Sequence, residues 1–321
     1  MKRYELGLIS KKRPAVYAIS ALVIMFFHSA VTFENSFLMN IKNRCSCGVD
    51  IFLLVSGICL YFSMKKNPGV RDFYLRRLKR VLLPALIVSA AWFIYTDLIG
   101  KGDLRLFLMD ISGITLFTRG TKAVWFVTAI ILDYLLYPFI FRYFEKNRWS
   151  KASFAVLFIA SFAVNLILRL LLPEIYGNSE ILWRRLPVFV TGCYLGAAVY
   201  ENKTLPINTW VIAAATIALT VVSIYIPYRE IGHLRYVFLP LAAGYTLLFA
   251  KAGEWKPLHK PAAFLAPLSL EIYLLHEKLL FLLEKTALPL LPLNLLAAAL
   301  AILGAYLLNR AEKLLTRRSF K

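Results

Sequence analysis

Two histidines lie at matching positions in two apolar segments of this sequence. His28 is 14 residues from the start of the segment 14–33, and His276 is 13 residues from the start of the segment 263–283. If both segments are helices that begin on the same side, a rise of 1.5 Å per residue places both imidazoles about 20 Å from that side. An imidazole can act as a base or as a nucleophile near neutral pH. The spacing therefore predicts one reactive site shared by both rings, unless each ring only bonds to a neighbouring helix.

A carboxylate, Asp50, lies near one end of a third apolar segment, 47–64. An ionisable group inside an apolar helix is costly, so its presence there indicates a functional role. Catalytic sites often hold an imidazole base in place with a third group that orients it. We expect Asp50 to enter the same cavity as the two histidines and to orient His28.

Basic residues gather just before the segment 80–98, and three arginines among them share one helical face. Arg76 and Arg80 are four residues apart, and Arg77 and Arg80 are three apart. Guanidinium groups bind phosphate through paired hydrogen bonds, so this face is a candidate phosphate site. The same charges also fit an ordinary cytoplasmic loop or a contact with anionic lipid.

The elements that must position these residues are membrane-spanning helices. The chain has 321 residues, of which 60% are hydrophobic, against roughly 45–50% in soluble domains. The apolar runs are continuous and close to the ~20 residues that a helix needs to cross a bilayer, which favours helices over a barrel. We expect an all-α bundle of about ten transmembrane helices, at 14–33, 47–64, 80–98, 123–144, 152–172, 185–200, 207–226, 234–250, 263–283 and 289–309. The shorter stretch 104–118 is expected to be interfacial or re-entrant.

Charge distribution predicts the orientation of this bundle. With the N-terminus in the cytoplasm, cytoplasmic segments hold roughly twice as many Lys and Arg residues as external ones, so both termini are expected inside. A cytoplasmic segment 1–13, a membrane domain 14–309 and a basic cytoplasmic tail 310–321 follow from this topology, in a multi-pass protein of the plasma or inner membrane. The net charge of +20 lies in short loops, which argues against nucleic acid as a partner. The four cysteines lack the spacing of a metal site, and no metal is expected.

Four sequence blocks resemble those of membrane-bound acyltransferase family 3, whose members acylate cell-surface glycans and related acceptors. The blocks are AISALVIMFFHS at 18–29, GVDIFLLVSGICLYFS at 48–63, FYLRRLKRVLLP at 73–84, and WFVTAIILDYLLYP at 125–138 with SLEIYLLH at 269–276. They follow the order of the family, and the resemblance covers residues 13–309.

The resemblance implies an enzyme that transfers an acyl group, most simply acetyl, from cytoplasmic acyl-CoA to a hydroxyl of a cell-surface glycan or glycan precursor. His28 matches the family histidine of the transfer step, and His276 matches a position that is often histidine. Asp50 matches the second block, and Arg77 and Arg80 match the paired arginines on the donor side. Membrane lipid surrounds such a protein, and acyl-CoA is a co-substrate, with no permanently bound cofactor expected.

One position departs from the family pattern. Members of the family usually have an arginine eleven residues before the histidine, where this chain has Tyr17. Arg13 lies four residues earlier, nearer the cytoplasm, and is a candidate to supply the missing charge. The expected donor-binding residues are therefore Arg13, Tyr17, Arg76, Arg77 and Arg80.

Two other classes of protein remain as alternatives. A transporter or flippase for a lipid-linked glycan or an organic anion would also carry buried His, Asp, Glu and Lys residues. Internal inverted repeats would favour a transporter, and we detect none in the sequence. A non-catalytic scaffold of a polysaccharide machine would leave the histidines and the arginine face without a purpose.

Overall fold

The computed structural model describes residues 3–226, 236 and 238–318 of the chain. Helices hold 83% of the residues, with almost no sheet, which confirms an all-α protein. Among the described residues, five helical segments are long and apolar enough to cross a membrane: Ser36–Lys66, Val70–Ile99, Trp125–Lys146, Lys151–Leu171 and Leu290–Leu314. Three shorter apolar helices, Arg13–His28, Thr209–Tyr225 and Phe238–Ala252, add to them. This is a multi-pass membrane architecture, and the total of about ten helices and the N-in, C-in orientation stay predictions.

The chain forms two compact units. The first contains Met1–Val55 and Ala198–Lys321, and the second contains Ser56–Ala197. Helix α4 (Gly48–Lys66) carries the chain from the first unit into the second, and α11 (Leu186–Tyr200) carries it back. Both crossings therefore lie within helices.

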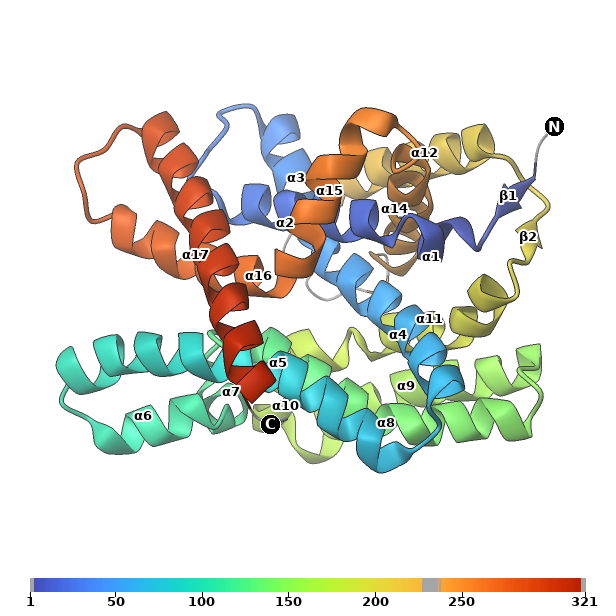
Figure 1. Cartoon of the computed structure of the whole chain (residues 1–321), viewed down its shortest axis with the longest axis horizontal. Helices are drawn as coiled ribbons and strands as arrows, with labels where there is room; N and C mark the ends of the chain where they lie inside the picture. Colours follow the sequence, from blue (N-terminus) through green and yellow to red (C-terminus); the bar gives the residue numbers. More distant parts are fainter. Residues whose placement is uncertain (1–2, 227–235, 237, 319–321) are drawn as a thin grey trace. The chain divides into compact units, whose positions relative to one another are not determined.

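The first unit surrounds helix α2 (Figure 1). Its helices and 3₁₀ turns are α1 (Leu8–Lys11), α2 (Arg13–His28), α3 (Ser36–Arg44), η1 (Cys45–Cys47), α12 (Thr209–Tyr225), α14 (Phe238–Ala252), η4 (Lys256–Leu258), α15 (His259–Leu265), η5 (Ala266–Leu268), α16 (Ser269–Leu283) and α17 (Leu290–Arg318). The strands β1 (Tyr4–Glu5) and β2 (Thr204–Leu205) pair antiparallel and join the two parts of this unit. Small residues let α2 approach α15 closely, because Ala15, Ala18 and Ala262 form one buried cluster.

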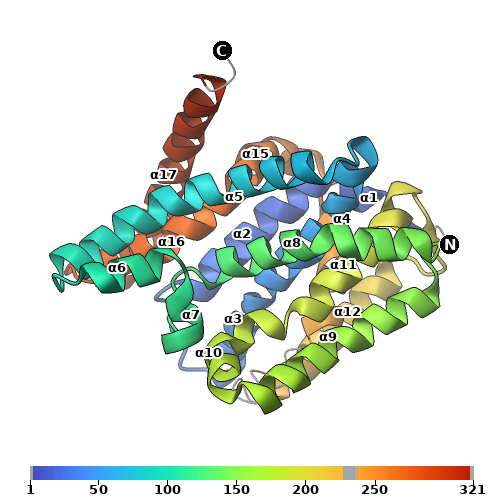
Figure 2. The same ribbon diagram turned by 90° about the horizontal axis from the view of Figure 1, so that it is seen from below.

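The second unit contains the π-helical turn η2 and the helices of the middle of the chain. These elements are α5 (Val70–Phe93), η2 (Ile94–Ile99), α6 (Leu104–Ile111), α7 (Ile114–Arg119), α8 (Trp125–Lys146), α9 (Lys151–Leu171) and α10 (Pro173–Trp183), with the larger parts of α4 and α11. Helices α5 and α8 pack against each other (Figure 2). Phe73 is fully buried and stacks on Tyr137, with ring centroids 5.6 Å apart. This aromatic contact fixes which face of α5 turns inward.

The segment predicted as a helix over 14–33 ends earlier, at His28. Ser29 leaves helical geometry, and its backbone N–H and hydroxyl both donate to the carbonyl of Phe26, at 3.2 and 2.7 Å. A second helix, α3, then begins within 34–46, which we expected to be a loop. Asn35 caps it by accepting hydrogen bonds from the N–H groups of Phe37 and Leu38. Local capping by short polar side chains therefore divides this region.

The span expected at 263–283 is also divided. Helix α15 passes through the short 3₁₀ turn Ala266–Leu268 before α16 begins at Ser269. Pro267 lacks an N–H group and cannot continue the α-helical hydrogen-bond ladder. The helix predicted over 80–98 is longer than expected, because α5 already begins at Val70 and the basic loop forms its first turns.

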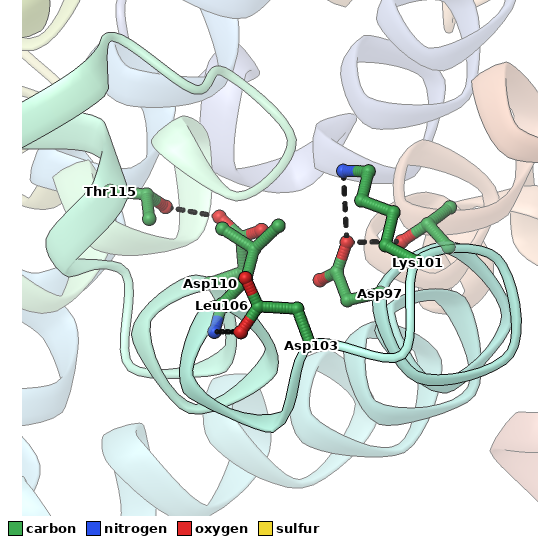
Figure 3. A network of polar contacts seen from close by, with 7 residues as sticks. Asp97, Lys101, Asp103, Leu106, Asp110 and Thr115 are labelled. Atoms are coloured by element: carbon green, nitrogen blue, oxygen red, sulfur yellow. Dashed lines mark hydrogen bonds and ion pairs between the residues drawn. The ribbon is translucent and has the colours of Figure 1, made fainter.

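Acidic side chains organise the stretch 104–118 (Figure 3). Asp103 caps α6 by accepting from the N–H of Leu106 at 2.8 Å, and Asp97 pairs with Lys101 at 3.4 Å. Asp110 is buried and accepts a hydrogen bond from the Thr115 hydroxyl, and burial raises its pKa. The two helices here have eight and six residues, too few to cross a bilayer.

Candidate active site

His28 is the last residue of α2, and its position follows from how that helix begins and ends. Pro14 lies in the first turn, where its missing N–H costs nothing, and the bonds of Ser29 to Phe26 close the last turn. The exposed carbonyl groups at a helix C-terminus favour positive charge nearby. A proton accepted by His28 would therefore be stabilised by its own helix.

His276 is buried within α16, with 5% of its surface exposed. Its Nδ1 lies 3.0 Å from the carbonyl oxygen of Ile272, one turn earlier. Leu268 and Ile272 pack with Ala305 of α17, and Met25 of α2 covers the same cluster. This packing fixes α16 against α2, so the second imidazole has a defined direction.

The two rings meet directly. Nε2 of His276 lies 3.0 Å from Nδ1 of His28, and the ring centroids are 5.0 Å apart. A carbonyl oxygen can only accept a hydrogen bond, so the bond to Ile272 places the proton of a neutral His276 on Nδ1. Nε2 of His276 then accepts from Nδ1–H of His28. The geometry thus assigns the lone pair of His28 to its outer nitrogen, Nε2.

A carboxylate stands next to that nitrogen. Oε1 of Glu277 lies 3.9 Å from Nε2 of His28, and the side chains of His28 and Glu277 are 23% and 64% exposed. The separation is too long for a hydrogen bond but short enough for electrostatic attraction. Glu277 is placed to stabilise an imidazolium at His28, and solvent weakens the effect.

The turn after His28 is anchored from two further helices. Lys42 of α3 donates from Nζ to the carbonyl of Ser29 at 2.7 Å. The N–H of Ala30 donates to Oδ1 of Asn294 in α17 at 2.9 Å. These contacts hold the end of α2 in place without touching the imidazole.

Asp50 lies in the first turn of α4 and is 1% exposed. Gly48 brings this turn close to α2, because a Cβ there would lie 2.7 Å from Ile24 and 3.2 Å from the carbonyl of Ser20. Among the described residues, no hydrogen bond joins Asp50 to either histidine, and His276 occupies the place beside Nδ1 of His28. A role of Asp50 in orienting His28 stays a prediction, and any influence on the rings would act through charge.

The donor-side candidates of the first unit lie at the other end of α2. Tyr17 is half-buried and stacks on Phe52 with ring centroids 5.6 Å apart. Arg13 is exposed at the first position of the helix. Eleven residues separate Tyr17 from His28, which is about 16 Å along the helix axis.

The arginine face belongs to α5 in the second unit. Arg76 and Arg80 are exposed, and Arg77 is half-buried. The buried face of α5 turns inward through Phe73, and the Tyr74 hydroxyl donates to the carbonyl of Leu135 at 2.9 Å. The guanidinium groups therefore stand on a helix whose rotation is fixed.

Sequence reasoning noted Glu277 as an ionisable residue of the segment 263–283 but gave it no role, and it did not single out Lys42 or Asn294. Glu277 and Asn294 had a usable signal, because each is a polar residue inside an apolar run. Lys42 had none, because it lies in a stretch that we expected to be a loop. Among the described residues, no group of three or more His, Cys, Asp or Glu side chains could hold a metal ion.

Residues 17–310 match the family model described as "Acyltransferase domain", which is nearly the whole chain. No curated protein and no solved structure matches the chain at a significant level.

Proposed function

The chain belongs to the acyltransferase 3 family, and from this membership we propose that it moves an acyl group from acyl-CoA to a hydroxyl of a cell-surface glycan or glycan precursor. Membership supports a membrane acyltransferase in general. The acyl-CoA donor, an acetyl group as the acyl unit and a glycan as acceptor are our proposals within that class.

The observation that carries the proposal is the hydrogen-bonded pair of imidazoles. His276 engages Nδ1 of His28, so Nε2 of His28 keeps its lone pair and faces away from the pair. The side chain of His28 is 23% exposed, and we propose that a substrate reaches this nitrogen. A base or nucleophile of an acyl transfer requires this combination of a free lone pair, an oriented ring and access.

In direct transfer, Nε2 of His28 removes the proton of the acceptor hydroxyl as its oxygen attacks the thioester carbonyl. The C–S bond breaks, and the imidazolium returns its proton to the departing thiolate of CoA. Glu277 and the end of α2 favour the positive charge that His28 carries between these steps. A well-placed general base contributes roughly 10²–10⁴-fold to such a rate.

In covalent transfer, Nε2 attacks the thioester carbonyl itself and the thiolate leaves, which gives an acyl-imidazole at His28. The acceptor hydroxyl then attacks this acyl group, which restores the free imidazole, and the proton of the hydroxyl passes through solvent to the CoA thiolate. The two routes differ in whether the acyl group is ever bonded to the protein. Labelling can separate them.

The proposed donor fits the basic residues of the chain. Acyl-CoA carries a 3′-phosphate and a pyrophosphate, and guanidinium groups recognise phosphate oxygens through paired donors. Arg76, Arg77 and Arg80 on α5 and Arg13 on α2 are the residues that we propose for this contact. Tyr17 offers only a phenol where the family usually has an arginine, so Arg13 is proposed to compensate.

The decisive experiment follows label from radioactive acetyl-CoA in proteoliposomes that hold the purified protein and an extracted surface glycan. His28→Ala is compared with the wild type. The matched control is His259→Ala, because His259 is an exposed histidine of the same unit that bonds to the carbonyl of Gly253 instead of the pair. Folding of each variant is checked by gel filtration.

We expect label to reach the glycan in the wild type and in His259→Ala, and transfer by His28→Ala to fall roughly 10²–10⁴-fold. Label retained on the wild-type protein but absent from His28→Ala would favour the covalent route. Equal transfer by all three proteins would remove His28 from the mechanism. No transfer by any folded protein would count against the enzyme and favour a transporter.

A further inference from the structure

An apolar groove on the first unit lies next to Arg310, which contacts one of the residues that line it. It is lined by Phe264 of α15 and by a stripe on α17, and its volume is about 380 Å³. The α17 residues are Ala299, Ile302, Leu303 and Tyr306. Successive steps of three or four residues continue this stripe to Arg310, which lies one helical turn beyond the last lining residue, Tyr306, and contacts it.

Arg310 is held in place by the aromatic end of the groove. Its Nε and Nη2 donate to the hydroxyl of Tyr306 at 3.1 and 2.9 Å, and its guanidinium carbon lies 5.4 Å from the centre of the Tyr306 ring. Tyr306 in turn lies beside Phe264, with ring centroids 6.1 Å apart. Because a guanidinium has five N–H donors, the exposed Arg310 keeps donors for an anion after these two bonds.

The length of the stripe matches one leaflet of a bilayer. Ala299 and Arg310 are eleven residues apart, about 16 Å along the helix, and half of a hydrocarbon core is about 15 Å. The candidate span ends at Leu314, so Arg310 lies within its last turn and a half, where a helix that crosses a bilayer reaches the lipid headgroups. An acyl chain beside Ala299 and Leu303 would thus place its phosphate near Arg310.

We propose that this groove binds one anionic phospholipid of the leaflet facing the C-terminus, with an acyl chain in the apolar part and the phosphate on Arg310. The charge of the guanidinium and the apolar stripe ending at it select this occupant over a second copy of the chain. Other apolar residues of α17, such as Leu295 and Leu307, are exposed but lie outside the groove. Neither histidine of the pair lines the groove, and the proposal does not depend on the proposed transfer reaction.

The test is native mass spectrometry of the purified full chain in detergent, titrated separately with phosphatidylglycerol and phosphatidylcholine. Arg310→Gln removes the phosphate contact. Ala299→Phe fills the groove, and Ala299 is exposed, so the larger side chain does not enter the core. Arg142→Gln is the matched control, because Arg142 is an exposed arginine near one end of the candidate span Trp125–Lys146 and does not line the groove.

We expect Arg310→Gln to weaken phosphatidylglycerol binding about fivefold, the contribution of one basic residue at a membrane surface. Ala299→Phe should remove the bound lipid, and Arg142→Gln should bind as the wild type does. The preference of the wild type for phosphatidylglycerol over phosphatidylcholine should disappear in Arg310→Gln.

Three outcomes would overturn the proposal. Equal lipid binding by the wild type, Arg310→Gln and Ala299→Phe would place the lipid elsewhere. An equal loss in Arg142→Gln would reduce the effect to general surface charge. Protein dimers that Ala299→Phe abolishes, without bound lipid, would show that a second chain fills the groove.

Discussion

His28 bonds to a second, buried imidazole and exposes less than a quarter of its side chain, whereas Arg76 and Arg80 stand exposed on the outer face of α5. In the first region, packing around Leu268 and Ile272 fixes the direction of one lone pair. In the second region, the helix is fixed but the charged ends of the side chains are solvated. A group that takes part in a reaction must be held in one orientation, as the imidazoles are. A group that binds an anion from solution must be exposed, as the arginines are. From this difference we expect the histidines to act on the rate of transfer and the arginines to act on the affinity for the donor.

Removing His276 should have the largest effect of the tests that follow. His276→Ala takes away the acceptor for Nδ1–H of His28, so both the orientation and the tautomer of His28 are lost. We expect the rate of transfer to fall roughly 10²-fold, measured as single-turnover label transfer. His276→Gln supplies a side-chain acceptor and should recover part of the rate, which a purely structural role of the buried ring would not predict. If His276→Ala transfers label at the wild-type rate, the contact between the two histidines does not contribute to the rate.

Removing Arg77 should weaken the binding of acyl-CoA. Arg77→Ala is expected to raise the KM for acyl-CoA about tenfold, the usual value of a charged hydrogen bond, with little change in kcat. Arg142→Ala, another arginine of the second unit, should leave the KM unchanged. The effect should shrink at high salt, because exposed charges are screened. A fall in kcat at an unchanged KM would place Arg77 in the chemical step instead.

Arg13 should show a smaller effect of the same kind. It is exposed at the start of α2, and we expect Arg13→Ala to raise the KM for acyl-CoA about threefold. Tyr17→Arg, which restores the usual residue of the family, should lower that KM in the Arg13→Ala background. If Arg13→Ala leaves donor use unchanged while Arg77→Ala abolishes it, Arg13 does not compensate for Tyr17.

The smallest expected effect is on the pH profile. A base must be unprotonated, so activity should decrease on acidification between about pH 8 and pH 5. The carboxylate of Glu277 stabilises the imidazolium, so Glu277→Gln should make His28 harder to protonate and move the acidic limb of the profile to lower pH. A flat profile in the wild type, or a move to higher pH in Glu277→Gln, would argue against a free imidazole base at this position.

The long apolar helices were predictable because composition alone defines them. The expected segment 152–172 agrees with α9 (Lys151–Leu171) within a residue, since Ser150 caps its start and Pro173 follows its end. The helix ends near the site were less predictable. The bonds of Ser29 and Asn35 compete with a continuing helix or loop, and such local bonds leave only a weak pattern in the sequence.

Residue counting predicted that His28 and His276 lie at the same level along their helices. It could not predict that the two rings contact each other. The count assumed a continuous α-helix over 263–283, whereas the structure has a 3₁₀ turn at Ala266–Leu268. Three residues at a 3₁₀ rise of about 2.0 Å lengthen the path by only about 1.5 Å. Which way each ring points depends on the rotation of α2 and α16 about their axes, and this is set by packing at Met25, Ile272 and Ala305. The tautomer, and with it the nitrogen of His28 that carries the free lone pair, follows only from the bond of His276 to Ile272.

His28 is the last residue of α2, so the helix holds its imidazole independently of the chain that follows. Ser29 and Ala30 are tied to Lys42 and Asn294, so the segment 31–35 begins from a fixed point. Insertions or exchanges in 31–35 would reshape the rim of the site while the imidazole keeps its direction. If the acceptor is a glycan, as we propose, remodelling this one short loop would change which sugar is accepted, and variants with exchanged loops would test this.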